Sequence, residues 1–184
     1  GLFTDVTATR MPTISASSTD VAAADVDGDG YVDLLFASGG QNRLYLNDKT
    51  GRFSDVTGTH MPAETAYDLC VALGDFDGDH DLDALLGSTD QDRLYLNDGT
   101  GHFTDATTGR IPSESQTSSA LALVDLDLDQ DLDVLIGRTT DLGPFTPVPR
   151  SILRNDGSGH FSQIDFDLES VSVQALATGD LDGD

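Results

Sequence analysis

Apolar side chains along this chain are grouped into short runs, and turn-forming polar residues separate the runs. The run at 31–38 is nearly continuous in apolar and β-branched side chains, as expected of a strand buried on both faces. The run at 52–57 instead places Phe53 and Val56 among polar positions. No segment of the sequence has the period of an amphipathic helix. The pattern therefore predicts an all-β protein.

The runs recur about every 50 residues, so the chain contains an internal repeat. One repeat reads as four strands, at 20–25, 31–38, 43–47 and 52–57. Four short antiparallel strands in each repeat are typical of a β-propeller blade. We expect three whole blades, at 20–57, 69–107 and 119–165.

Both ends of the chain fall within a repeat. We expect 1–19 to hold the last strand of a preceding blade, at 2–7, and a connector, and 174–184 to begin a further blade. An insertion at 139–149 holds three of the six prolines and reads as an extended excursion loop. Because unpaired strand edges are templates for pairing, the strand at 2–7 should complete a blade with other parts of the same polypeptide or with a second copy.

Aspartates are concentrated between the first and second strands of each repeat. About half of the 33 acidic residues lie in four short segments there. Two unit charges about 4 Å apart repel by roughly 4 kcal/mol at an effective dielectric of about 20. This crowding predicts a bound cation that offsets the repulsion.

Oxygen ligands at alternate positions of a tight loop can converge on a hard cation, as positions 1, 3 and 5 of an EF-hand loop do. We number the loops at 25–33, 75–83 and 125–133 from 1 to 9, and expect side chains at 1, 3, 5 and 9 and the carbonyl at 7 to bind. The expected ligands are Asp25, Asp27, Asp29, Tyr31 and Asp33; Asp75, Asp77, Asp79, Asp81 and Asp83; Asp125, Asp127, Asp129, Asp131 and Asp133; and, in an unfinished fourth loop, Asp180, Asp182 and Asp184.

The ion that suits these oxygen ligands is Ca²⁺, with one expected in each of the three complete loops and a fourth at 180–184 if the chain continues. Mg²⁺ prefers strict octahedral geometry, and Zn²⁺ prefers imidazole and thiolate. Position 6 turns sharply in an EF-hand loop and is glycine there. Gly30 meets this need, whereas His80 and Gln130 would be strained at positive φ. We therefore expect the third loop to bind Ca²⁺ more weakly than the first.

The stretch DVDGDGYVDLLFASGGQNRLYLNDKTGRFSDVT resembles the FG-GAP-like or VCBS repeat, which is related to the calcium-binding blades of integrin α-subunit propellers. The resemblance covers nearly the whole chain. It implies a propeller of about seven blades with one Ca²⁺ in the first hairpin of each blade, secreted or on a cell surface. The Phe-Gly…Gly-Ala-Pro signature of the family is absent, and Leu128 and Gln130 stand where the first loop has Gly28 and Gly30.

The formal net charge of −24, with only nine basic residues, excludes a general nucleic-acid binder and argues against docking on anionic membranes. No apolar run approaches the length of a membrane span. The Ser/Thr-rich segments between blades, such as 107–120, read either as polar connectors or as a face that binds a protein or glycan. Cys70 starts an apolar run and reads as a small core residue.

No convincing catalytic constellation is present, so we expect no enzyme. His60 aligns with Arg10 and Arg110 in the connectors. These three read as exposed or ion-paired loop residues, with an anionic or glycan ligand as the alternative. Arg43 and Arg93 also recur, and we expect them to form ion pairs between blades.

Three classes of function remain open. The first is a calcium-stabilised extracellular propeller for binding or adhesion. The second is a structural subunit of an extracellular filament or repeat array, assembled through the incomplete blades. The third is the scaffold of a calcium-dependent polysaccharide-active enzyme, which a cluster of Lys, Tyr, Arg and His at one mouth would favour. We see no such cluster in the sequence.

Overall fold

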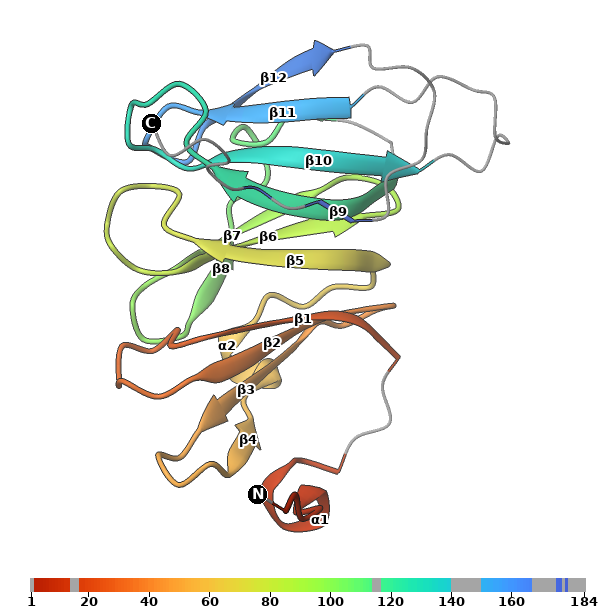
Figure 1. Ribbon diagram of the computed structural model, residues 1–184, viewed down its shortest axis with the longest axis vertical. Helices are drawn as coiled ribbons and strands as arrows, with labels where there is room; N and C mark the ends of the chain where they lie inside the picture. Colours follow the sequence, from red (N-terminus) through yellow and green to blue (C-terminus); the bar gives the residue numbers. More distant parts are fainter. Residues whose placement is uncertain are drawn as a thin grey trace.

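The described residues form three four-stranded antiparallel sheets. The computed structural model describes residues 2–13, 17–113, 117–139 and 150–166, together with 175, 176 and 178. The sheets are stacked in chain order along the long axis of the molecule (Figure 1). The predicted all-β fold with propeller-blade repeats is confirmed, and the described residues form a stack of blades rather than a closed ring.

Each sheet follows the chain order of its strands. The first blade contains β1 (Ser18–Ala24), β2 (Asp33–Ser38), β3 (Arg43–Asn47) and β4 (Phe53–Asp55). The second contains β5 (Asp68–Gly74), β6 (Asp83–Ser88), β7 (Arg93–Asn97) and β8 (Phe103–Asp105). The third contains β9 (Thr117–Val124), β10 (Asp133–Thr139), β11 (Arg150–Asn155) and β12 (Phe161–Phe166).

Two short helices, α1 (Thr7–Arg10) and α2 (Thr57–His60), lie in the connectors. They were not expected from the sequence, which shows no helical period. Among the described residues, no helix is both long enough and apolar enough to cross a membrane.

The first hairpin of every blade has the same register. Ala24 pairs with Asp33, Gly74 with Asp83, and Val124 with Asp133. Position 9 of each aspartate loop is therefore the first residue of the second strand. The register places the three loops on one side of the stack, at the left of Figure 1.

The fourth strands of the first two blades are shorter than predicted. We expected strands at 52–57 and 102–107, but β4 and β8 each end after three residues. Asp55 Oδ1 accepts a hydrogen bond from the Thr57 amide at 2.9 Å, and this turn ends β4. Thr57 Oγ1 then accepts the Leu44 amide at 3.0 Å. The third repeat lacks this Asp-x-Thr sequence, and β12 continues for six residues.

The expected strand at 2–7 is not formed. Residues 2–6 are irregular, Leu2 and Phe3 are fully exposed, and α1 begins at Thr7. A strand needs a hydrogen-bonded neighbour, as β4 has in β3, and the described residues supply none here. The expected insertion at 139–149, apart from Thr139, and most of the expected further blade at 174–184 lie outside the described residues.

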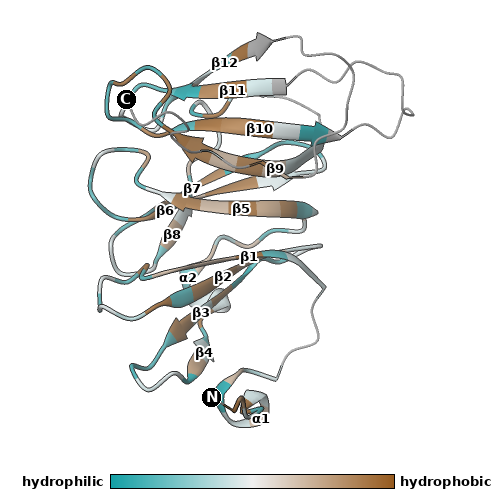
Figure 2. Cartoon of the chain, in the orientation of Figure 1, coloured by the Kyte–Doolittle hydropathy of each residue, from teal (hydrophilic) through white to brown (hydrophobic). Residues whose placement is uncertain are grey.

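Apolar side chains form a cluster between each pair of neighbouring blades. Figure 2 shows hydrophobic segments, in brown, along the strands of all three blades. The first cluster joins Val26, Leu35, Ala37 and Leu44 of the first blade to Val71, Ala84, Leu86, Tyr95 and Phe103 of the second. The second joins Phe76, Leu85 and Leu94 of the second blade to Ile111, Val134, Ile136, Leu153 and Phe161. Burying one such large side chain contributes about 1.5–3 kcal/mol. Cys70 is buried, as expected.

A buried polar cluster also links the first two blades. Glu64, in the connector, accepts a hydrogen bond from Tyr95 Oη at 2.6 Å and one from Asn42 Nδ2 of the first blade. Asn42 also donates to Asp68 Oδ2 at 2.6 Å. Arg93 lies 3.4 Å from Glu64 and 3.1 Å from Asp68. The five side chains of this cluster are thus hydrogen-bonded or ion-paired to one another between the blades.

The expectation of inter-blade ion pairs at Arg43 and Arg93 is wrong for Arg43. Its guanidinium lies 3.3 Å from Asp55 of β4, within the same sheet. Arg93 pairs with Asp68 of its own sheet and with Glu64 of the connector. Among the described residues, Arg43 has no partner equivalent to Glu64. The sequence of the connector before the first blade carries no acid at residues 14–16, the segment that corresponds to Glu64.

Glu64 should give the stability of the protein a specific pH dependence. Burial, with the nearby Asp68, raises the pKa of Glu64 to about 7. The folded state therefore holds this proton more tightly than the unfolded state, so the stabilisation is complete below the unfolded pKa of 4.5 and is lost as the pH rises through about 7. The free energy of unfolding should fall by roughly 2 kcal/mol across this window. Urea unfolding at several pH values, with saturating Ca²⁺, would measure it.

The matched variant is Glu64→Gln, which keeps the acceptor oxygen but cannot titrate. Relative to Glu64→Gln, the wild type should lose unfolding free energy as the pH rises through about 7. A difference that stays constant from pH 4.5 to pH 7 would contradict the assignment to Glu64.

Candidate metal centres

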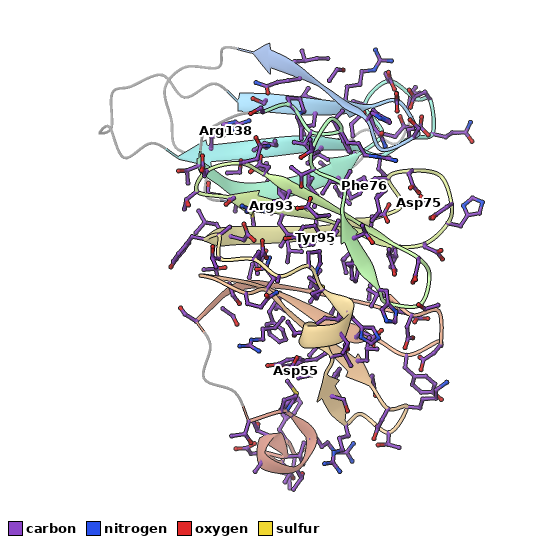
Figure 3. The ribbon with its side chains drawn as sticks, turned by 180° about the vertical axis from the view of Figure 1, so that it is seen from behind. Asp55, Asp75, Phe76, Arg93, Tyr95 and Arg138 are labelled. Carbon is purple, nitrogen blue, oxygen red and sulfur yellow. The ribbon has the colours of Figure 1, made fainter. Side chains whose placement is uncertain are left out.

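The loops between the first two strands of each blade place acidic side chains together. One oxygen from each of three carboxylates lies within 4.8 Å of the others in every loop. The groups are Asp25, Asp27 and Asp29; Asp75, Asp77 and Asp83; and Asp125, Asp127 and Asp133. Figure 3 shows Asp75 on the loop side of the second blade, while the next residue, Phe76, points into the space between blades.

The aspartate at position 9 is buried in all three loops and fixes the loop to its hairpin. Asp83 Oδ2 accepts the Phe76 amide at 3.0 Å, and its Oδ1 accepts the Asn97 amide at 2.9 Å. Asp33 and Asp133 make the same two kinds of bond. Each oxygen keeps a lone pair, so the carboxylate can hold the backbone and still bind a cation.

The aspartates at positions 1 and 5 shape the turn. Asp25 Oδ2 accepts the Gly30 amide at 2.7 Å, and Asp29 Oδ1 accepts the Tyr31 amide at 2.9 Å. The corresponding bonds recur in the other two loops. These bonds turn the carboxylates inward and bring like charges close together.

Positions 4 and 6 are left-handed in every loop. In the first loop both are glycine, Gly28 and Gly30, with φ of 70° and 88°. His80 has φ of 74°, Leu128 of 64° and Gln130 of 77°. His80 and Gln130 thus adopt the positive φ at which we expect strain, and the third loop carries two such residues.

Leu128→Gly should therefore stabilise the protein. The Leu128 side chain is 84% exposed, so its removal loses little packing, and glycine relieves the strain of the left-handed backbone. We expect a gain of about 1 kcal/mol in unfolding free energy. The reverse change in the first loop, Gly28→Leu, should cost a similar amount. Chemical denaturation of both variants would test the pair, and equal stability of Leu128→Gly and wild type would contradict it.

Two loop carboxylates have an oxygen without a hydrogen-bond partner. Asp77 Oδ1 and Asp125 Oδ1 are buried and accept no hydrogen bond from the described residues. Burial raises the pKa of Asp33 and Asp77 above the ordinary range and raises that of Asp83 to about 7. A cation at the centre would satisfy the unpaired oxygens and favour the charged carboxylates.

The expected side-chain ligands Asp33, Asp79 and Asp129 are not among the three carboxylates that converge in their own loops. The side chains of Asp81 and Asp131, whose carbonyls are the expected ligands, lie over Gly99 and Gly157 of the following turn, where an added Cβ would collide with them. The fourth loop, with Asp180, Asp182 and Asp184, lies outside the described residues.

Each of the first two loops also accepts a hydrogen bond from the next blade along the chain. The sequence did not predict this contact. Asn97 Nδ2 donates to the Val26 carbonyl at 2.8 Å, and Asn155 Nδ2 donates to the Phe76 carbonyl at 2.8 Å. Both carbonyls belong to position 2 of the preceding blade's loop. The only sequence signal is the asparagine that recurs at the end of each third strand.

The recurring basic residues of the connectors contact the turn between the third and fourth strands of the next blade. Arg10 donates to the Thr50 carbonyl, and Arg110 donates to the Ser158 carbonyl. His60 instead stacks on His102, with ring centroids 3.7 Å apart. Burial, with the neighbouring His102, lowers the pKa of His60. These contacts link each connector to the blade that follows it.

Four-stranded sheets stacked in chain order, each with an acidic loop in its first hairpin, define a repeat protein of the β-propeller type. The family model described as FG-GAP-like repeat matches residues 25–86 and 75–136. Each match begins at position 1 of an aspartate loop and ends in the second strand of the following blade. The chain belongs to the FG-GAP-like repeat family. No curated protein matches it.

Proposed function

We propose that this chain is a calcium-binding region of an extracellular β-propeller, in which each complete aspartate loop holds one Ca²⁺ and so fixes the first hairpin of its blade. The observation that carries the proposal is the pair of buried, unpartnered oxygens, Asp77 Oδ1 and Asp125 Oδ1, in loops rich in carboxylates. An all-oxygen set of this kind suits a hard cation, and a loop with six to eight available oxygens suits Ca²⁺.

Calorimetric titration of the chelator-treated chain with Ca²⁺ tests this proposal. Each of the three complete loops should take up one ion. Asp77→Asn and Asp125→Asn should each weaken one site by at least about tenfold, because each removes a ligand charge. Asp98→Asn, in an exposed turn outside the loops, is the matched control and should leave all sites unchanged. Absence of Ca²⁺ uptake would refute the proposal.

The role we propose for the calcium-stabilised region is binding or adhesion, not catalysis. The partner would be a protein or glycan at the connector side of the blades. The connector there packs against the turn after β2, with Gln41 Nε2 donating to the Pro62 carbonyl at 3.0 Å. A cavity of about 450 Å³ on this side is lined by aromatic and polar groups, including Tyr67, Asp90 and Arg93.

A glycan microarray would test the connector side as a binding surface. Tyr67→Ala should abolish binding of any glycan that the wild-type chain retains, because the exposed ring of Tyr67 offers a stacking surface at the cavity. Tyr31→Ala, which removes an exposed ring on the loop side, should retain it. Equal loss in both variants would refute a site at the connector side.

The second candidate is a structural subunit of an extracellular filament or repeat array. Leu126 of the third blade is 43% exposed, whereas its equivalents Val26 and Phe76 are 3% and 0% exposed. The outer face of the third blade thus resembles the faces that are buried between blades. Sedimentation velocity over a range of concentrations would detect association, and Leu126→Lys should abolish it.

A further inference from the structure

The third blade differs from the other two beside its aspartate loop. The residue before the recurring asparagine of the third strand is Leu46 in the first blade and Leu96 in the second, and both leucines pack against the inter-blade cores. The third blade has Arg154 at this position, and half of its side chain is exposed to solvent. The substitution replaces an apolar contact by a charge next to the loop.

The guanidinium of Arg154 reaches two of the expected calcium ligands. Its Nη2 contacts Asp127 Oδ2 and lies 3.9 Å from Asp129 Oδ2. These carboxylates occupy positions 3 and 5 of the third loop. The permanent positive charge of Arg154 therefore offsets part of the repulsion between these carboxylates, which would otherwise favour a divalent ion.

In each of the other two loops, the nearest cationic side chain lies within 4 Å of one ligand carboxylate. In the first loop, the mostly exposed Lys49 ammonium lies 3.2 Å from Asp29 Oδ2, and its charge also acts on Asp27 from a greater distance. In the second loop, Nδ1 of the exposed His80 ring lies 3.4 Å from Asp75 Oδ2, and the more distant charge of Arg110 acts on Asp77. Among the described loops, only the third has one cationic side chain whose nitrogen lies within 4 Å of two ligand carboxylates.

We propose that Arg154 is a built-in competitor of Ca²⁺ in the third loop, so that this loop binds the ion only when the guanidinium moves away. The inference rests on the proposed calcium binding and extends it to a difference between sites. A cavity of about 470 Å³ beside Arg154, Asp129 and His160 gives the side chain room to move. The third loop is then the site that empties first as the Ca²⁺ concentration falls.

Site-resolved NMR titration of the full chain with Ca²⁺ tests the proposal. The position 6 amides of Gly30, His80 and Gln130 each donate to the position 1 carboxylate of their own loop, so their signals report one site each. Arg154→Gln should tighten the third site by at least about fivefold and leave the other two unchanged. Arg52→Gln, which removes an exposed charge that contacts no loop carboxylate, is the control for net charge.

The salt dependence gives a second readout. An exposed charge pair is screened by salt, so the difference between wild type and Arg154→Gln should shrink as ionic strength rises. A structural role for Arg154 would not produce this trend.

The outcomes separate the inference from the proposed function. If the first two loops bind Ca²⁺ and the third binds equally in wild type and Arg154→Gln, the competitor role of Arg154 is wrong and the calcium proposal stands. If the third binds in neither, the competitor role is wrong and the calcium proposal holds for the first two loops only. If no loop binds Ca²⁺, the proposed function itself fails. A third site that binds only in Arg154→Gln supports the inference.

Discussion

Excess chelator should lower the melting temperature of this chain by about 10 °C or more. An ion present at 100 times its dissociation constant adds about 2.7 kcal/mol of stability per site. In a chain of this size, about 1 kcal/mol corresponds to a shift of about 2–4 °C. Three complete loops with crowded carboxylates should each contribute, since without an ion the unpartnered oxygens of Asp77 and Asp125 stay unsatisfied.

Circular dichroism melting curves with and without chelator would measure this shift. Adding back Ca²⁺ should restore the original transition, whereas Mg²⁺ at the same concentration should restore it only in part. A thermal transition that does not respond to chelator would remove calcium from the explanation of stability.

Asp83→Ala should lower the free energy of unfolding by about 3–5 kcal/mol even in excess chelator. The variant leaves the buried amides of Phe76 and Asn97 without their acceptor. Each unsatisfied buried group costs about 1–3 kcal/mol, and a small cavity adds to the loss. Urea denaturation in chelator isolates this structural part from the contribution of the ion.

Two further variants make this prediction specific. Asp83→Asn keeps one acceptor oxygen and should be intermediate in stability. Asp81→Ala changes a partly exposed side chain at position 7 and should stay within about 0.5 kcal/mol of wild type. If Asp81→Ala and Asp83→Ala were equally stable, the two hydrogen bonds of Asp83 would not be what fixes the hairpin.

The blades and their acidic loops could be predicted because the sequence repeats. A strand assignment made in one repeat is checked by the next, as with the two copies of RLYLN that form β3 and β7 as expected. The carboxylates that converge follow from positions 1, 3, 5 and 9 of a tight loop. The strained backbone of Gln130 could be anticipated because a sharp turn there requires positive φ whatever residue occupies it.

Contacts that depend on where other segments lie could not be predicted. Arg43 and Arg93 occupy the same place in their repeats, yet they pair with different acids because Glu64 is present in only one of the two connectors. The ends of β4 and β8 depend on a side chain that captures a backbone amide two residues later. A strand pattern at 2–7 forms no strand without a neighbour.

The asparagine of the next blade that hydrogen-bonds to each of the first two loops sets an order of events during synthesis. Asn97 follows Val26 by 71 residues, and Asn155 follows Phe76 by 79 residues. A chain growing at about 5–20 residues per second needs several seconds to extend from one partner to the other. During that time the acidic loop has left the ribosome but its last hydrogen bond cannot form. The two loops therefore complete their hydrogen bonding in order from the N-terminus, each only after the next blade has been synthesised as far as its third strand.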